Sequence, residues 1–141
     1  MKRFAVIIAV VVAVMAALVA PAMAGGRPLT ADLNGANEVG SGDPDGSGSA
    51  HVTLNQGQGE VCFSIETTNV EDILFAHIHV GVAGVNGGVV VNLDWDNTGG
   101  QGCVSADGDT IKQIRQNPSG YYINVHSVEF PPGAIRGQLS K

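Results

Sequence analysis

Basic side chains are scarce in this chain, which has 7 Lys and Arg residues against 13 Asp and Glu residues. The resulting net charge of −6 repels nucleic acid phosphates and anionic lipid head groups, so we expect no nucleic acid partner. The sequence also lacks a Gly-x-Ser-x-Gly motif and any other complete catalytic constellation. It therefore gives no reason to expect a hydrolase, and no catalytic residue is predicted.

Cysteine and aromatic residues are also few. The chain has 2 cysteines, Cys62 and Cys103, and only 5% aromatic residues. The absence of a CxxC motif argues against redox catalysis by these thiols. The N-terminal pattern described in the next paragraph predicts that the chain is exported. Because disulfides persist outside the cytoplasm, we expect a disulfide between these two cysteines. A link across 41 positions stabilises a fold by ~4 kcal/mol in the chain-entropy model, which matters for a small domain with few aromatics.

Charge is absent from the long apolar run near the N-terminus. Lys2 and Arg3 precede this run, which covers residues 4–20, and Ala-Met-Ala at 22–24 matches a signal peptidase site. The pattern predicts a cleaved signal peptide at residues 1–24 and one mature domain at 25–141. The alternative is an uncleaved anchor, since the run is near the ~17-residue minimum for a membrane span. No cysteine is placed to carry a lipid, so we expect a secreted or periplasmic protein with no membrane attachment after cleavage.

The mature part consists of short runs of β-branched and aromatic residues separated by turns, many of them at the 20 glycines. One stretch differs: Ile111 and Ile114 stand at helical spacing, with Asp109 placed to cap a short helix that ends at Pro118. We predict an all-β Greek-key sandwich or barrel, immunoglobulin-like or superoxide-dismutase-like, with one short helix. The expected strands are residues 29–33 (at a sheet edge), 50–54, 61–65, 75–80, 88–93, 121–128 and 134–139.

Four segments in order resemble the CHRD domain, the module repeated in chordin and also found alone in exported bacterial proteins. They are LTADLNGANEV at 29–39, FAHIHVGVAGVNGGVVV at 75–91, NPSGYYINVHS at 117–127 and GAIRGQL at 133–139. One position departs from the family pattern, because Ala134 stands where the family usually has Glu. The resemblance implies an immunoglobulin-like β architecture, and it implies no particular activity.

Histidine provides the candidate site. His77 and His79 share one face of their predicted strand, with Cα atoms ~6.5–7 Å apart, and can lean onto one metal ion. His126 is the expected third ligand, because it lies in the other strand that carries a family-like motif. His51 is a weaker fourth candidate, since its strand could lie anywhere relative to the other two.

Neutral imidazoles suit copper, zinc or nickel, and we expect copper, with zinc as the alternative. The HxH pair and the late histidine are similar to the copper ligands of copper,zinc superoxide dismutases. The sequence lacks the His/Asp-rich loop of their zinc site, so dismutase activity is not expected. We expect a nearby acid such as Glu129 to compensate the charge of the ion.

Two hypotheses for the function remain open from the sequence. In the first, the protein binds metal outside the cytoplasm. In the second, the histidines are hydrogen-bonded residues that fix the fold, and the acidic domain is an interaction module for an extracytoplasmic protein or glycan. Removing the histidines would abolish metal binding in the first case and leave partner binding intact in the second.

Overall fold

The structure, a computed structural model, describes residues 26–141. The predicted signal peptide at residues 1–24 lies outside the described residues. Within residues 26–141, no helix has the length and apolar character needed to cross a membrane.

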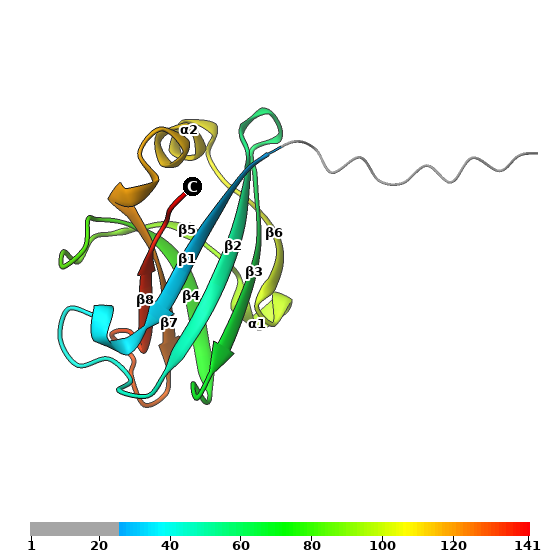
Figure 1. Ribbon diagram of the computed structural model, residues 1–141. Helices are drawn as coiled ribbons and strands as arrows, with labels where there is room; N and C mark the ends of the chain where they lie inside the picture. The colour runs from blue at the N-terminus through cyan, green and yellow to red at the C-terminus, as the bar shows by residue number, and fades with distance from the viewer. Residues whose placement is uncertain (1–25) are drawn as a thin grey trace, which may run out of the picture.

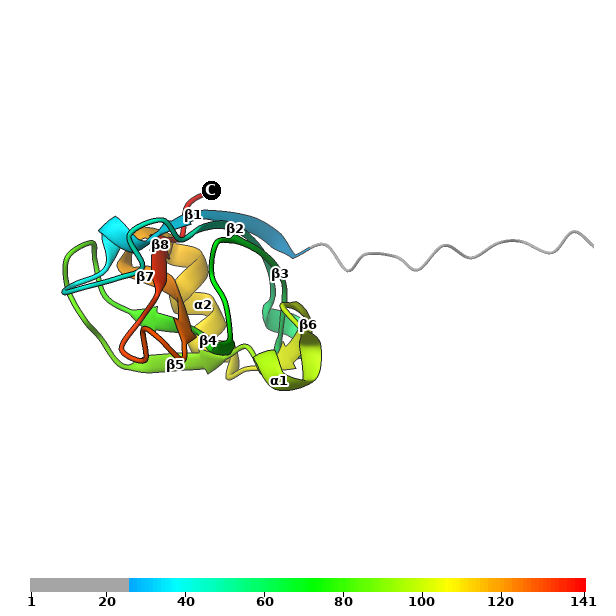
Figure 2. The ribbon, with the colours of Figure 1, turned by 90° about the horizontal axis from the view of Figure 1, so that it is seen from below.

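The described residues form one antiparallel sheet that curls into a nearly closed barrel (Figures 1 and 2). Along the sheet the strands follow the order β5-β4-β7-β8-β1-β2-β3-β6. Their bounds are β1 (Arg27–Asn34), β2 (Ser47–Asn55), β3 (Glu60–Thr68), β4 (Ile73–Val80), β5 (Val89–Asn92), β6 (Gln101–Ser105), β7 (Tyr121–Ser127) and β8 (Ile135–Gln138). The all-β prediction is confirmed, in the barrel form.

Alternation along the strands builds the core. In β2 and β3, every second side chain is buried inside the barrel and the side chains between them are less buried, as a two-residue period requires. The inward side chains are almost all aliphatic, and each buried Leu, Ile or Val stabilises the fold by ~1.5–3 kcal/mol. They include Leu29, Ala31, Leu33, Ala50, Val52, Leu54, Val61, Phe63, Ile65, Ala76, Ile78, Val91, Ile123, Val125 and Ile135.

Helix α2 (Gly108–Gln116) closes one end of the barrel with Ile111 and Ile114, both fully buried (Figure 1). The predicted helix is present, but its cap is Asp107 and not Asp109. The Asp107 side chain accepts a hydrogen bond from the Thr110 amide at 2.9 Å. Asp107 has the extended backbone that an N-cap needs, whereas Asp109 already lies in the first turn of the helix.

The two sheet edges differ from the prediction. Strand β1, expected at an edge, pairs with β2 along its length and with β8 on its other side, because the C-terminal segment returns beside it. The edges are β5 and β6, which are connected through a short helix, α1 (Trp95–Thr98). Cys62 on β3 and Cys103 on β6 face each other in register and form the predicted disulfide, which fastens the β6 edge.

Candidate metal centre

The outward side chains of β4 and β7 form a compact group. Because the two strands are antiparallel and in register, these side chains lie in three rows. Phe75 faces His126, His77 faces Asn124, and His79 faces Tyr122. The register therefore brings together three of the predicted ligands from segments almost 50 residues apart in the sequence.

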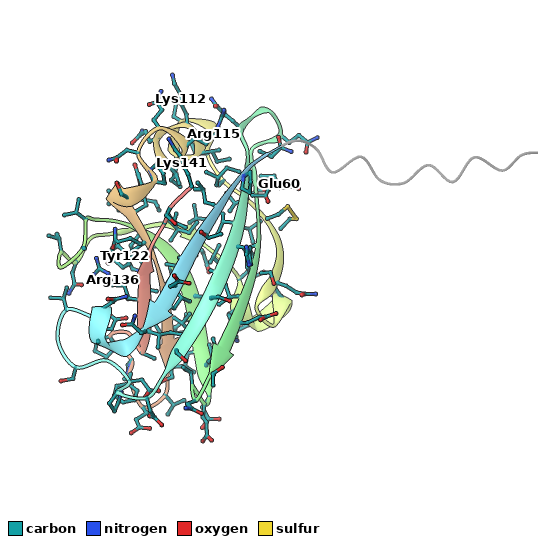
Figure 3. All side chains as sticks on the ribbon, viewed as in Figure 1. Glu60, Lys112, Arg115, Tyr122, Arg136 and Lys141 are labelled. Carbon is teal, nitrogen blue, oxygen red and sulfur yellow. A yellow bond between two sulfur atoms is a disulfide. The ribbon has the colours of Figure 1, made fainter. Side chains whose placement is uncertain are left out.

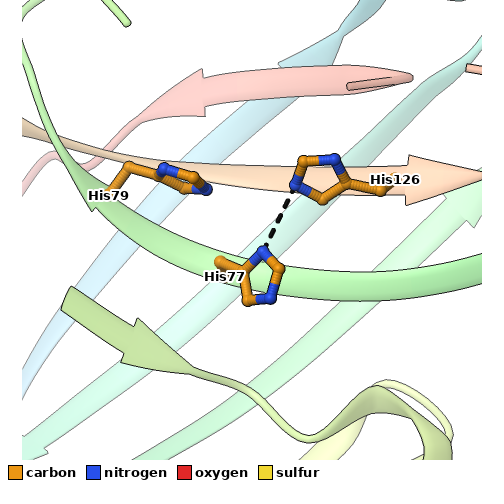
Figure 4. Close-up of side chains that lie close together, drawn as sticks. All are labelled: His77, His79 and His126. Atoms are coloured by element: carbon orange, nitrogen blue, oxygen red, sulfur yellow. Dashed lines mark hydrogen bonds between the residues drawn. The ribbon is translucent and has the colours of Figure 1, made fainter. Parts of the chain in front are cut away.

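The three imidazoles face a common point (Figure 4). His77 Nδ1 lies 3.3 Å from His126 Nε2, and each of His77, His79 and His126 offers a ring nitrogen within 4.8 Å of the others. Metal–nitrogen bonds of ~2.0–2.1 Å would require separations of roughly 3.5 Å between ligand atoms. One pair already meets this value, and the His79 nitrogen would have to move closer to the other two to complete the set.

Main-chain carbonyl groups fix two of the tautomers. His79 Nδ1 donates to the carbonyl oxygen of Gly87 at 2.9 Å, and His126 Nδ1 donates to that of Pro131 at 2.9 Å. A neutral imidazole that carries its proton on Nδ1 has a free lone pair on Nε2. Both Nε2 atoms are therefore acceptors, and metal-binding histidines usually have this type of outer hydrogen bond.

His79 Nε2 is buried and has no hydrogen-bond partner among the described residues. The whole side chain is only 9% exposed, so bulk water does not satisfy this atom. A buried acceptor without a partner costs ~1–3 kcal/mol, and such atoms are rare in folded proteins. An electron-pair acceptor at this point would remove the cost.

Burial keeps two of the rings neutral. The pKa of His77 is lowered to about 4, mainly by burial, with smaller contributions from the neighbouring His126 and His79. The pKa of His79 is also lowered, mainly by burial and against the effect of the Gly87 hydrogen bond. Since only unprotonated imidazoles bind metal, both rings are ready to do so at neutral pH.

The loop between β4 and β5, residues 81–88, holds His79 in place. Gly87 supplies the carbonyl group that His79 binds, and its amide donates to the Tyr122 hydroxyl at 3.2 Å. The Tyr122 ring stacks on the His79 ring with centroids 4.9 Å apart and planes 10° apart. Position 87 has to be glycine, because a Cβ atom there would collide with the Val80 carbonyl oxygen.

Arg136 of β8 anchors the same loop. Its guanidinium lies over the Tyr122 ring, 3.4 Å from the centroid, and the two side chains lie side by side in Figure 3. Its Nη2 donates to the carbonyl oxygens of Val82 and Val85 at 3.0 and 2.8 Å. Arg136 is only 1% exposed, so its charge holds the loop and does not face solvent.

A carboxylate lies beside the cluster, but it is Glu38 and not Glu129. Asn124 Nδ2 donates to the two Glu38 oxygens at 2.9 and 3.2 Å. Burial raises the pKa of Glu38, while the Asn124 hydrogen bond and the charge of Arg136 oppose that rise. Glu129 is exposed and lines a separate cavity with Asp43 and Glu71.

The structure does not bring His51 to this cluster. His51 is exposed on β2, which is separated from β7 by β8 and β1. Sequence reasoning missed the contributions of Gly87, Pro131, Glu38 and Arg136. Two of them act through main-chain carbonyl groups, which no side-chain pattern reveals, but Glu38 and Arg136 lie within the family-like segments and could have been considered.

The chain was also compared with known proteins. The family model of the CHRD domain matches residues 29–139, a range that begins in β1, ends just after β8 and includes His77, His79 and His126. No curated protein and no solved structure matches the chain. Because the family match covers most of the sequence and agrees with the resemblance of its motifs, this chain belongs to the CHRD domain family.

Proposed function

We propose that this protein binds copper outside the cytoplasm through His77, His79 and His126. One observation carries the proposal: the Gly87 carbonyl group holds His79 so that its buried Nε2 presents a lone pair that no group among the described residues satisfies. His126 Nε2 is an acceptor for the same reason. Three histidines with ligand atoms this close form a donor set suited to a transition metal.

In the metal-free protein, His77 Nδ1 donates to His126 Nε2 across the site. An ion would take the place of this hydrogen bond, and the His77 proton would move from Nδ1 to Nε2. We favour copper over zinc because divalent copper binds a given nitrogen site more tightly than zinc does. When bound, copper would supply Lewis acidity and one-electron chemistry, while the protein holds and shields the ion.

An extracytoplasmic location is part of the proposal. The Cys62–Cys103 disulfide supports it, because disulfides persist in oxidising compartments. Membership of the CHRD family supports it too, since these domains are modules of extracellular type.

The direct test is titration of Cu(II) and Zn(II) into metal-stripped protein at neutral and at mildly acidic pH. We expect one ion per chain, tighter binding of copper, and weaker binding in acid as protons compete for the rings. His77→Ala and His126→Ala should each weaken binding by more than about tenfold, while His51→Ala serves as the matched control. If neither ion binds the folded wild-type protein more tightly than a variant that carries both His77→Ala and His126→Ala, the histidines are structural.

In that event the second candidate function, an interaction module for an extracytoplasmic protein, becomes the better account. Exposed apolar side chains on and beside the 81–88 loop favour it, because such patches mark interaction surfaces. They are Val80, Val82, Val85 and Val89, each more than 40% exposed. Changing these valines to Ser should then weaken partner binding without changing the fold.

A further inference from the structure

Asn124 lies in the middle of the candidate metal centre. It is directly opposite His77 in the β4–β7 register and two residues before His126 on its own strand. Directly opposed Cα atoms lie ~4.5–5.5 Å apart, and residues two apart along a strand ~6.5–7 Å. Asn124 is therefore an immediate neighbour of His77 across the two strands and of His126 along its own strand, on the face that carries the three imidazoles.

Glu38 determines which way the Asn124 amide faces. Asn124 Nδ2 makes contacts of 2.9 and 3.2 Å with the two Glu38 oxygens. An ionised carboxylate accepts hydrogen bonds and has no proton to donate, so the amide nitrogen must face Glu38. The amide oxygen is then directed away from Glu38.

The Asn124 oxygen is left without a partner. The residue is only 3% exposed, and its Oδ1 has no hydrogen-bond donor among the described residues. His79 Nε2, on the same face, is in the same situation. Both atoms are acceptors, so they cannot satisfy one another, and the His77 Nδ1 proton already goes to a third acceptor, His126 Nε2. Acceptors gathered on one face need a shared donor or a cation.

We propose that Asn124 Oδ1 is a fourth, oxygen donor to the copper ion and that Glu38 positions it. This inference rests on the copper site proposed above. An oxygen donor is harder than imidazole nitrogen and favours Cu(II) over Cu(I), whose preferred ligands are soft. The set of three imidazoles and one amide oxygen therefore gives the site a preference for the oxidised ion.

Asn124→Leu tests the oxygen donor, since it keeps the branched arrangement of four side-chain heavy atoms, removes both polar atoms and leaves little room for a replacement water. The affinity for Cu(II) should fall about tenfold or more, whereas that for Cu(I) should change much less. The electron paramagnetic resonance spectrum of bound Cu(II) should shift in its parallel g value and retain coupling to three nitrogens. The matched control is Asn92→Leu. Asn92 flanks His77 on β5, and its amide oxygen already accepts a hydrogen bond from Asp94.

A second variant separates ligation from folding. In Glu38→Gln with Asn124→Asp, the two side chains exchange roles, because the new amide at 38 can donate to the new carboxylate at 124. The pair keeps its hydrogen bond and presents an anionic oxygen to the ion. Cu(II) should bind this double variant at least as tightly as the wild-type protein, even if Asn124→Leu is poorly folded.

The outcomes separate the two proposals. If wild-type protein binds no copper, the proposed function fails and the fourth donor fails with it. If copper binds through the histidines but the spectrum and the Cu(II) to Cu(I) preference are the same in Asn124→Leu, only the fourth donor is wrong. A double variant that binds Cu(II) much more weakly than wild type while unfolding cooperatively would also overturn it.

Discussion

Strands β2 and β7 have similar inner faces and very different outer faces. The outward side chains of β2 are exposed or half-buried, and His51 among them is exposed. In β7 every residue from Tyr121 to Val125 is buried, so this strand is covered on both faces. The difference shows that alternation along a strand places a side chain inside or outside the barrel but does not determine whether the outside is covered.

The covered outer face concentrates the polar residues that are costly to bury. Among the residues that the structure describes, the buried polar or charged ones are Asp43, His79, Asn124, Ser127 and Arg136, and three of them, His79, Asn124 and Arg136, share this outer face. Burying a polar group costs free energy unless a partner compensates it. Such groups collected on one face, two of them with unsatisfied atoms, indicate a functional site more than a device for stability.

The largest expected effect comes from the disulfide, which lies on strands that carry no metal ligand. Changing Cys62 and Cys103 together to Ala should lower the free energy of unfolding by about 4 kcal/mol, because the unfolded chain regains the freedom of a long loop. Denaturant unfolding of the oxidised wild type and the variant measures the difference.

The same variant should bind copper as the wild type does, since neither cysteine lies on a strand that carries a ligand. A folded variant that lost its copper would show that the two regions are not independent.

Arg136→Met should cost less, about 2–4 kcal/mol of unfolding free energy. It leaves the carbonyl oxygens of Val82 and Val85 without their donor and the 81–88 loop without its anchor. Chemical denaturation measures the loss, and Lys112→Met, at an exposed position on α2, is the control expected to stay within about 0.5 kcal/mol. Equal effects of the two changes would contradict the anchoring role.

A pH series tests whether the covered outer face keeps one ring, that of His77, in its neutral form. Because the pKa of His77 is about 4 in the folded protein against an ordinary value of 6.5, the unfolded chain binds more protons between these pH values. The free energy of unfolding should therefore fall as pH drops from 6.5 toward 4. In metal-free protein, His77→Gln should lose less stability than wild type between pH 7 and pH 4.5. Parallel losses would mean that His77 is not held in its neutral form.

The smallest expected change in the free energy of unfolding comes from a substitution on the outer face of β2. His51→Ala should change the free energy of unfolding by less than about 0.5 kcal/mol, because the ring is exposed. The thermal melting curves of the variant and the wild type should coincide without copper, and they should also coincide with copper. A loss of the copper-induced shift would place His51 in the site after all.

Sequence reasoning predicted the strands with strong alternation and failed where other forces decide. The runs at 50–54 and 61–65 became β2 and β3 because apolar residues at every second position leave one buried face. Strand β6 was missed, since its residues, QGCVS, show no apolar alternation and the strand is held by the β3 pairing and the disulfide.

The candidate site was predictable in part. The spacing of His77 and His79 places both on one face of a strand, and the recognised family segments suggested His126 as their companion. The register that sets Asn124 opposite His77 is a tertiary property, as is the position of the 81–88 loop over His79. Neither property can be read from a pattern in the sequence. The hydrogen bonds from His79 and His126 to main-chain carbonyl groups and the Glu38–Asn124 pair are therefore seen only in the structure.

The most direct test of the central claim is a crystal structure of copper-loaded protein with anomalous diffraction measured on both sides of the copper absorption edge. The account predicts one anomalous peak on the outer face of β4 and β7, within bonding distance of His77, His79 and His126. A peak elsewhere on the barrel, or no peak in crystals grown with excess copper, would contradict it.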